Sequence, residues 1–248
     1  AVFLDIYALR YIKQLNGKVL RHGAVIGALL YFSYLFQMWG INYTTASNAA
    51  FITALSVVLV PVLGLLFFGI RAEKKVVLAV FIAVIGLLLL TGGNPLNWNK
   101  GDGLVLICSI TVAFHIIYTG RFAPLHNFIV LTAVQLTTVS LLSMLALPFS
   151  PVEWPDISPG SFAAMLYLGL FGTVYTYIMQ TAMQRYTTTA RTALVFSMEP
   201  VFAAFFAYII ANEQLGWQGW LGGLLIVGSV LITEVPYLRI HHFFYRKS

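Results

Sequence analysis

Eight apolar stretches, each about as long as a bilayer is wide, fill the chain from Gly23 to Val235. A helix needs roughly 20 apolar residues to cross the hydrocarbon core. None of the eight stretches shows the polar and apolar alternation of a barrel strand, so we expect helices. The sequence therefore predicts an all-α polytopic membrane protein. The predicted spans are 23–43, 48–68, 76–91, 103–120, 128–147, 161–183, 191–211 and 217–235.

The composition and the absence of catalytic motifs narrow the class further. The chain is 60% hydrophobic and only 9% charged, which is too few charges to cover a soluble surface. Its single cysteine, Cys108, lies inside an apolar stretch and leaves no disulfide framework or paired-cysteine metal site. No HExxH, GxSxG or Walker motif is present. We therefore expect neither an enzyme nor a bound metal or cofactor, and no nucleic acid partner.

The basic residues between the stretches indicate the topology. If residues 10–22 lie in the cytoplasm, the positive-inside rule places nearly all the basic residues on that side, and only Lys100 falls outside. This arrangement predicts a multi-pass protein of the cell membrane whose C-terminal tail, 236–248, is cytoplasmic. The cytoplasmic residues are Lys13, Lys18, Arg21, Arg71, Lys74, Lys75, Arg121, Arg185, Arg191, Arg239, Arg246 and Lys247.

An internal repeat becomes visible when the chain is aligned with itself, without a gap, at the offset that carries Tyr34 onto Tyr177. An odd number of spans lies between the repeats, so the second is inverted in the membrane, as in many transporters. The identical pairs at this repeat offset are Tyr34 and Tyr177, Gln37 and Gln180, Tyr43 and Tyr186, Thr44 and Thr187, Thr45 and Thr188, Ala50 and Ala193, Val58 and Val201, Val84 and Val227, and Leu88 and Leu231.

The repeat also predicts the division of the chain into segments. Residues 23–91 form a first half with three helices, and residues 103–235 form a second half with five. The first half is thus two helices short, and residues 1–22 are expected to be a helical remnant at the membrane interface, or alternatively a shortened spanning helix, with a cytoplasmic segment. Residues 236–248 form the tail.

Two segments carry a family resemblance, NYTTASNAAFITALSVVLVPVLG at 42–64 and RYTTTARTALVFSMEPVFAAFFAYIIANEQL at 185–215. They resemble the EamA-type exporters of the drug/metabolite transporter superfamily, over residues 20–235. The resemblance implies two inverted five-helix halves around a central cavity, with both termini cytoplasmic. Two features depart from the family pattern. The first helix and most of the second are missing, and Gly69-Ile70 replaces a frequent Gly-Glu pair.

Glu199 and His115 are the strongest candidates for a site within the spans. A carboxylate at mid-span costs about 2.5–3.5 kcal/mol on insertion scales, so Glu199 must face protein or water. It either titrates a proton or contacts a cation, or it is a buried acid beside the helix distortion at Pro200. His115 shares a helix face with Thr111 and Tyr118, and it either serves the cavity or donates a hydrogen bond between helices.

Two further pairs are related by the repeat, Tyr34 with Gln37 and Tyr177 with Gln180. Each pair is spaced to lie on one helix face. These amide and phenol groups either line the cavity or bridge helices, since both roles are common in membranes. The predicted cavity residues are therefore Tyr34, Gln37, His115, Tyr118, Tyr177, Gln180 and Glu199.

Together these patterns predict a secondary transporter that exports small metabolites, amino acids or related polar compounds, by alternating access. Proton coupling through Glu199 is part of this hypothesis. The motifs Gly23-x-x-x-Gly27 and Gly219-x-x-x-Gly223 suit close helix packing by default, or a homodimer. The alternatives are a truncated membrane protein that does not transport, a channel-like protein and an unrecognised integral membrane protein.

Overall fold

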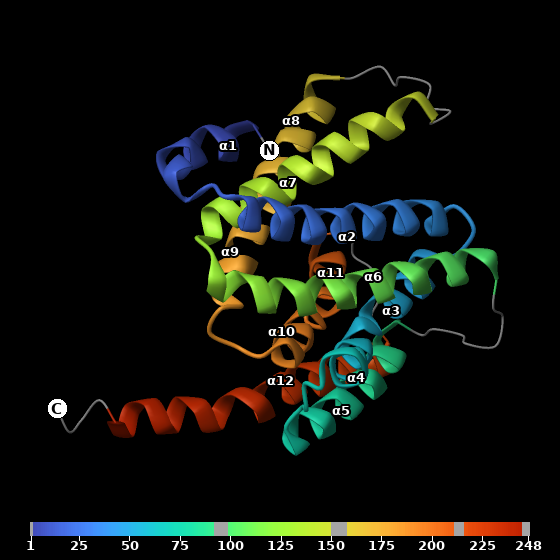
Figure 1. Ribbon diagram of the computed structural model, residues 1–248. Coiled ribbons are helices and arrows are strands. Elements are labelled where there is room, and N and C mark those ends of the chain that lie inside the picture. The colour runs from blue at the N-terminus through green and yellow to red at the C-terminus, as the bar shows by residue number, and fades with distance from the viewer. Residues whose placement is uncertain (1, 92–98, 150–157, 211–215, 245–248) are drawn as a thin grey trace. The chain divides into compact units, whose positions relative to one another are not determined.

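A computed structural model describes residues 2–91, 99–149, 158–210 and 216–244 (Figure 1). These residues form helices joined by short connections, and no strand occurs among them. The elements are α1 (Val2–Ala8), η1 (Leu9–Gln14), α2 (Gly17–Ile41), α3 (Ala46–Ala54), α4 (Ser56–Phe68), α5 (Lys74–Thr91), α6 (Lys100–Phe122), η2 (Ala123–Leu125), α7 (Phe128–Ala146), η3 (Leu147–Phe149), α8 (Pro159–Tyr167), η4 (Leu168–Tyr175), α9 (Thr176–Met183), α10 (Thr189–Phe196), α11 (Glu199–Ile210) and α12 (Trp217–Phe244).

Seven helical stretches of the described chain are long and apolar enough to cross a membrane, and the eighth predicted span contains a shorter apolar helix, Trp217–Thr233. The predicted all-α polytopic class is thereby confirmed. Residue 211, the expected end of the seventh span, and residues 245–248 of the tail lie outside the described residues. The seven stretches are Gly17–Ile41, Asn48–Phe68, Lys74–Thr91, Lys100–Leu125, Phe128–Ala146, Pro159–Met183 and Thr189–Ile210.

The chain divides into two compact units. The first unit comprises residues 1–32 and 118–187, and the second comprises residues 33–117 and 188–248. Helices α2 and α6 are each divided between the units, with one part in the first unit and the other part in the second. Each unit has buried apolar clusters of its own.

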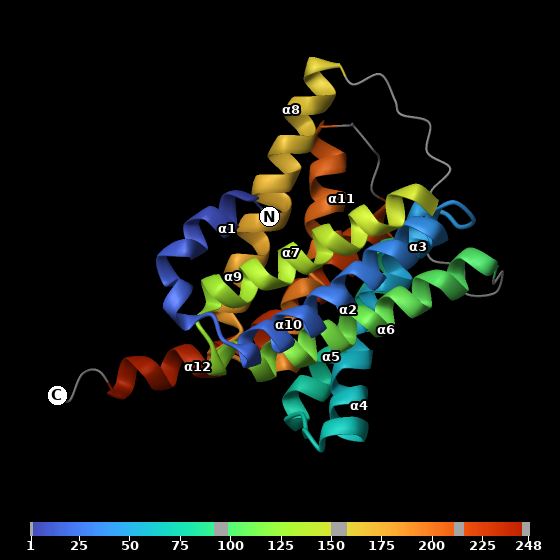
Figure 2. The same ribbon diagram turned by 45° about the horizontal axis from the view of Figure 1, so that its top comes forward.

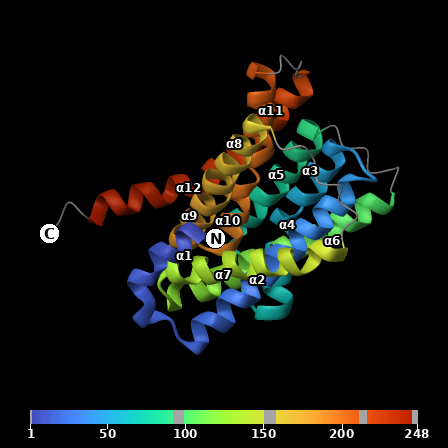
Figure 3. The ribbon, with the colours of Figure 1, turned by 90° about the horizontal axis from the view of Figure 1, so that it is seen from above.

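Glycines in the first unit allow α2 and α7 to approach closely (Figure 2). A Cβ atom on Gly23 would lie 2.5 Å from Val134 Cγ1, and one on Gly27 would lie 2.5 Å from the Gln135 carbonyl oxygen. The first small-residue motif therefore packs within the chain, as expected by default. In the same unit, α8, η4 and α9 follow one another as a single rod, with a π-helix at Leu168–Tyr175 (Figure 3).

The N-terminal segment packs on α7 in the first unit. Leu4 of α1 is buried in a cluster with Ile129 and Ala133, and Thr137 Oγ1 donates a hydrogen bond of 2.8 Å to Asp5 Oδ1. With seven residues, α1 is far shorter than a membrane span. Its predicted place at the interface stays a prediction.

A histidine pair joins the start of α2 to the connection before α7. His22 Nδ1 lies 2.8 Å from His126 Nε2, and the Phe122 ring stacks on the His22 ring with centroids 3.8 Å apart. Burial lowers the pKa of His126, and the nearby charges of His22 and Lys18 lower it further. Both imidazoles are therefore favoured in the neutral form, and the N–H of one ring donates a hydrogen bond to the bare nitrogen of the other.

The histidine pair should make stability depend on pH. Folding lowers the pKa of His126, so at mildly acidic pH the unfolded chain binds more protons than the folded protein. The stability that this shift contributes is fully present above the ordinary pKa of 6.5 and is lost as pH falls through the pKa of His126 in the folded protein. We expect His126→Asn, which keeps a polar side chain but does not titrate, to flatten the decline of the unfolding midpoint below pH 6.5. Thermal unfolding in detergent between about pH 5 and pH 8 measures this slope. An equally steep decline in the variant would contradict the assignment.

In the second unit, α5 lies along α12 because two glycines face each other. A Cβ atom on Gly86 would lie 2.7 Å from the Gly222 carbonyl oxygen, and a Cβ atom on Gly222 would lie 2.5 Å from the Gly86 carbonyl oxygen. Fully buried Leu87 and Ile226 pack into the same apolar cluster. This contact carries much of the packing of the second unit.

Local structure in the second unit recurs at the repeat offset. Thr45 caps α3 by accepting from the Asn48 amide at 3.2 Å, and Thr188 caps α10 by accepting from the Arg191 amide at 3.4 Å. Both caps have nearly the same backbone angles, φ −78° and ψ 153° for Thr45 and φ −82° and ψ 153° for Thr188. The two Tyr-Thr-Thr turns of the sequence repeat thus start helices in the same way.

Both capped helices are interrupted after about two turns. α3 ends at Ala54 and α4 begins at Ser56, while α10 ends at Phe196 and α11 begins at Glu199. The repeat offset carries Ser56 onto Glu199, so the two new helices begin at equivalent positions. These two interruptions position the candidate site.

Candidate functional site

A cavity of about 250 Å³ lies at the two helix interruptions, entirely within the second unit. Residues on both sides of each interruption contribute to its wall, together with α2 and α6. Discontinuous helices in transporters typically mark the substrate site, because their ends present unused polar groups within the membrane. The lining residues are Gln37, Ile41, Ala46, Ala49, Ala50, Thr53, Ala54, Ser56, Val112, Phe196, Ser197, Glu199, Pro200 and Ala203.

Three polar side chains of this wall, Gln37, Ser56 and Glu199, have no hydrogen-bond or ion-pair partner among the described residues. Ser56 is only 6% exposed. Gln37 is half-buried and Glu199 is exposed, so only Ser56 is a buried residue of this kind; buried polar groups are normally hydrogen-bonded, so such a group on a cavity wall indicates a place for a polar ligand or for water. Ser197 differs, because its hydroxyl donates a hydrogen bond of 2.6 Å to the Leu194 carbonyl oxygen.

A fourth polar group, the Thr53 hydroxyl, lies at the end of α3. Its Oγ1 is buried and has no nitrogen or oxygen partner within the described chain, and the Cys108 thiol is its neighbour. The Thr53 carbonyl oxygen accepts a hydrogen bond of 3.2 Å from Ser109. The first interruption therefore places Ser56 on the cavity wall, while the Thr53 hydroxyl is buried beside Cys108.

Glu199 occupies the first turn of α11, directly before Pro200. A carboxylate in the first turn of a helix is stabilised by the helix dipole, and proline is favoured there because its missing N–H would be unused. The side chain is accessible in the described structure. A charge this deep in a span is tolerated where it faces a water-filled cavity, and the position of Glu199 meets that requirement.

The structure brings together two of the predicted cavity residues, Gln37 and Glu199, in one wall. Tyr34 and His115 belong to the same unit but are not among the lining residues, and His115 is buried within α6 at 3% exposure.

The other three predicted residues belong to the first unit. Tyr118 packs beside Phe122 with ring centroids 5.5 Å apart, and Tyr177 packs on the cluster that contains Leu4. Gln180 Nε2 donates to Gln184 Oε1 at 3.4 Å. Their role in a cavity stays a prediction.

Sequence reasoning did not identify Ser56 or Thr53. Serine and threonine are common in membrane helices, and single hydroxyls among apolar residues carry little signal. The repeat held a usable signal, since the offset that aligns the Tyr-Thr-Thr turns also places Ser56 opposite Glu199. Comparing the non-identical residues at this offset would have identified Ser56 as the counterpart of Glu199.

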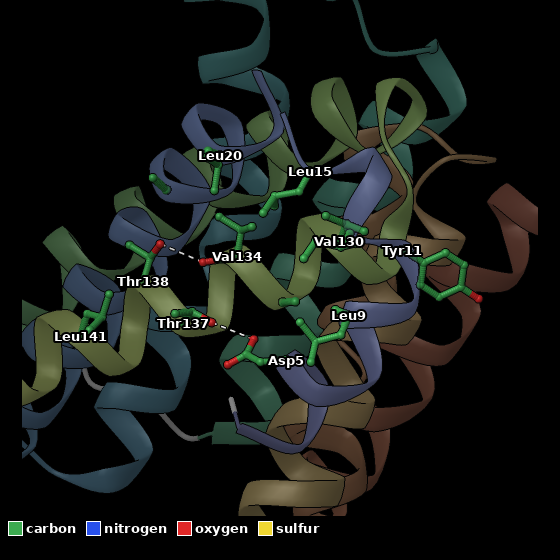
Figure 4. Close-up of a pocket in the computed structure, with 14 residues that line it drawn as sticks. Asp5, Leu9, Tyr11, Leu15, Leu20, Val130, Val134, Thr137, Thr138 and Leu141 are labelled. Atoms are coloured by element: carbon green, nitrogen blue, oxygen red, sulfur yellow. Dashed lines mark hydrogen bonds between the residues drawn. The ribbon is translucent and has the colours of Figure 1, made fainter. Parts of the chain in front are cut away.

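Other cavities differ in chemistry. One of about 420 Å³ lies in the first unit and is mostly aliphatic, with Leu9, Leu15 and Leu141 around the bonded pair Asp5 and Thr137 (Figure 4). A smaller one in the second unit is lined in part by Glu73, whose Oε1 lies 3.2 Å from Arg191 Nη2. Arg191, a basic residue that the sequence places on the cytoplasmic side, thus has a specific partner.

A family model described as the EamA-like transporter family matches residues 1–92 and 99–235. The chain belongs to the EamA-like transporter family. The match begins at residue 1, earlier than the resemblance expected from residue 20, so it includes α1 and η1. The predicted membrane and transporter character of the chain is thereby confirmed.

Relatives of this EamA-like transporter are named as transporters too. A protein named "Uncharacterized transporter" from Archaeoglobus fulgidus is 30% identical over 230 residues, covering 93% of this chain and 74% of that protein. "Uncharacterized transporter YyaM" from Bacillus subtilis is 27% identical over 208 residues, covering 79% and 66%. A crystal structure of another protein shares the fold, with a TM-score of 0.77, 16% identity, and coverage of 96% of this chain and 84% of that one.

Proposed function

We propose that this EamA-like transporter is a secondary transporter that moves small polar metabolites, amino acids or related compounds, through the cavity at the two helix interruptions. The observation that carries the proposal is the convergence of Gln37, Ser56 and Glu199, none of them hydrogen-bonded within the described chain, on one cavity between interrupted helices. Substrate sites of many transporters are built in this way.

The proposed direction is export across the cell membrane, by alternating access of the cavity to either side. The internal repeat supports this mechanism, because two inverted halves can adopt each other's conformations and so open in turn. The basic residues support a cytoplasmic C-terminus.

A proton gradient is the proposed energy source, and Glu199 is the proposed proton carrier. Within the described lining it is the one titratable side chain. A carboxylate that exchanges between a proton and a substrate cannot hold both, which couples their movements in opposite directions. Tyr34, His115, Tyr118, Tyr177 and Gln180 remain proposed contributors to the transport path.

A flux measurement in proteoliposomes tests the function. Radiolabelled amino acids, amines, organic acids and nucleobases are loaded as a panel, and exchange is compared with that of protein-free vesicles. A transporter moves at least one compound in a saturable way. A truncated membrane protein that does not transport moves none, and a channel passes ions without saturation.

Gln37→Ala should weaken substrate affinity. Loss of one hydrogen bond costs about 0.5–1.5 kcal/mol, so we expect the half-saturating concentration to rise about threefold to tenfold, with the maximal rate little changed. Gln218→Ala is the matched control, because Gln218 is exposed on α12 and is not part of the cavity wall. Equal affinity in the two variants would return Gln37 to a packing role. Gln180→Ala tests its repeat partner in the same assay.

A further inference from the structure

We propose that Ser56 and Glu199 form the two ends of a binding site for a small zwitterion, with Glu199 taking the ammonium group and Ser56, at the start of α4, taking the carboxylate. The inference rests on the proposed function and narrows its substrate class. It assigns a role to Ser56 and a fixed orientation to the substrate.

The two ends are equivalent in position and opposite in chemistry. Ser56 begins α4, of 13 residues, and Glu199 begins α11, of 12 residues, and the repeat offset aligns them. The N-terminus of a helix carries a partial positive charge that attracts anions. At α11 the carboxylate of Glu199 itself offsets that charge. At α4 the equivalent position holds a neutral serine, and because only one residue separates α3 from α4, the Ser56 hydroxyl is the group that this helix start offers to an anion.

Ser56 gives independent support for a ligand at this helix start. Its side chain is 6% exposed, lines the cavity and hydrogen-bonds to no described residue. The residue is buried, yet its hydroxyl oxygen is absent from the fully buried polar atoms, so the hydroxyl opens toward the cavity, where a bound acceptor would give it a partner.

The charges of the wall select among ligand classes. Glu199 is the one charged side chain in the described lining, and no lysine, arginine or histidine accompanies it. A simple anion would be repelled by Glu199, and a simple cation would leave the Ser56 hydroxyl unmatched. A zwitterion satisfies both groups. The same wall contains the apolar residues Ile41, Val112 and Phe196, which suit an apolar side chain.

Matched compounds test the proposal in proteoliposomes. Three sets are built on alanine, leucine and phenylalanine, each set containing the amino acid, the amine without the carboxylate and the acid without the amine. We expect at least one amino acid to exchange about tenfold or more faster than both of its relatives. Equal exchange of the amine or the acid, or exchange of nucleobases alone, would overturn the zwitterion site while leaving the transport function intact. No exchange of any compound would contradict both.

Ser56→Ala separates the two ends of the site. Removing the hydroxyl should weaken amino acid exchange by about threefold to tenfold and leave exchange of the matched amine unchanged. Glu199→Gln should weaken the amino acid and the amine together. Size-exclusion profiles and unfolding midpoints in detergent establish that each variant is folded. If Ser56→Ala affects the amine as strongly as the amino acid, Ser56 does not hold the carboxylate.

Discussion

Glu199→Gln is expected to reduce substrate-linked proton movement to the level of protein-free vesicles, while the protein remains folded. Glutamine keeps the shape of the side chain and its place in the first turn of α11 but cannot bind and release a proton. Because no other titratable side chain lines the described cavity wall, no neighbour in that wall can replace it. A pH-sensitive dye inside proteoliposomes, read as substrate is added outside, measures the effect.

Glu73→Gln is the matched control for this experiment. Glu73 is an acid of the same unit, but it pairs with Arg191 and lies outside the cavity wall. The Glu73 side chain is 50% exposed but that of Arg191 only 11%, so the unfolding midpoint of this variant is measured alongside to establish that it is folded. Unchanged proton movement in Glu199→Gln, or an equal loss in both variants, would remove Glu199 from the coupling mechanism.

Gly222→Ala is expected to be the most destabilising single-methyl change in the second unit. The new Cβ atom would lie 2.5 Å from the Gly86 carbonyl oxygen and 2.6 Å from the Leu90 amide nitrogen, and both are backbone atoms that cannot rotate away. Helices α5 and α12 must then separate, which also loosens Leu87 and Ile226 in the cluster that they share. Overpacking of this kind costs about 1–3 kcal/mol.

Gly228→Ala on the same helix is the control for this packing prediction. A Cβ atom there has no neighbour within 4 Å, so we expect an unchanged or slightly raised unfolding midpoint. Thermal unfolding of both variants in the same detergent measures the difference. Equal midpoints would show that α5 and α12 are not in the close contact described.

Much of the fold follows from features that a sequence displays directly. The apolar runs predicted a membrane protein, because a helix that crosses the hydrocarbon core of a bilayer must be apolar over about 20 residues. The repeat paired Thr45 with Thr188, and these two residues cap α3 and α10. Gly69, the glycine of the Gly69-Ile70 pair that departs from the family pattern, ends α4 at φ 64°, a conformation that suits glycine.

The helix interruptions were harder to predict. Pro200 signals the start of α11, since proline suits the first turn of a helix. No comparable signal precedes α4, where the break falls at Leu55 and Pro61 lies inside the new helix. Proline distorts a helix in the residues before it, but this preference does not fix at which residue before Pro61 the break falls.

The candidate site was predictable only in part. Glu199 stood out because a carboxylate within a span is costly, and Gln37 because it recurs in the repeat. Their convergence on one cavity depends on which faces α2 and α11 present, which apolar helices with little amphipathic pattern do not reveal. The partner of Gln180 is one turn away at Gln184, a spacing that is visible in the sequence.

Access to the cavity from the two sides of the membrane tests the central claim most directly. Cys108 is the single cysteine of the chain, so Cys108→Ser gives a background without cysteine. Ala54→Cys on this background places one thiol in the cavity wall. Val57→Cys, at a position that is 0% exposed, is the control. A membrane-impermeant thiol reagent is added to vesicles of either orientation. The account predicts labelling at position 54 from both sides, slowed by substrate, and none at position 57. Labelling at position 54 from one side only, unaffected by substrate, would contradict transport through this cavity.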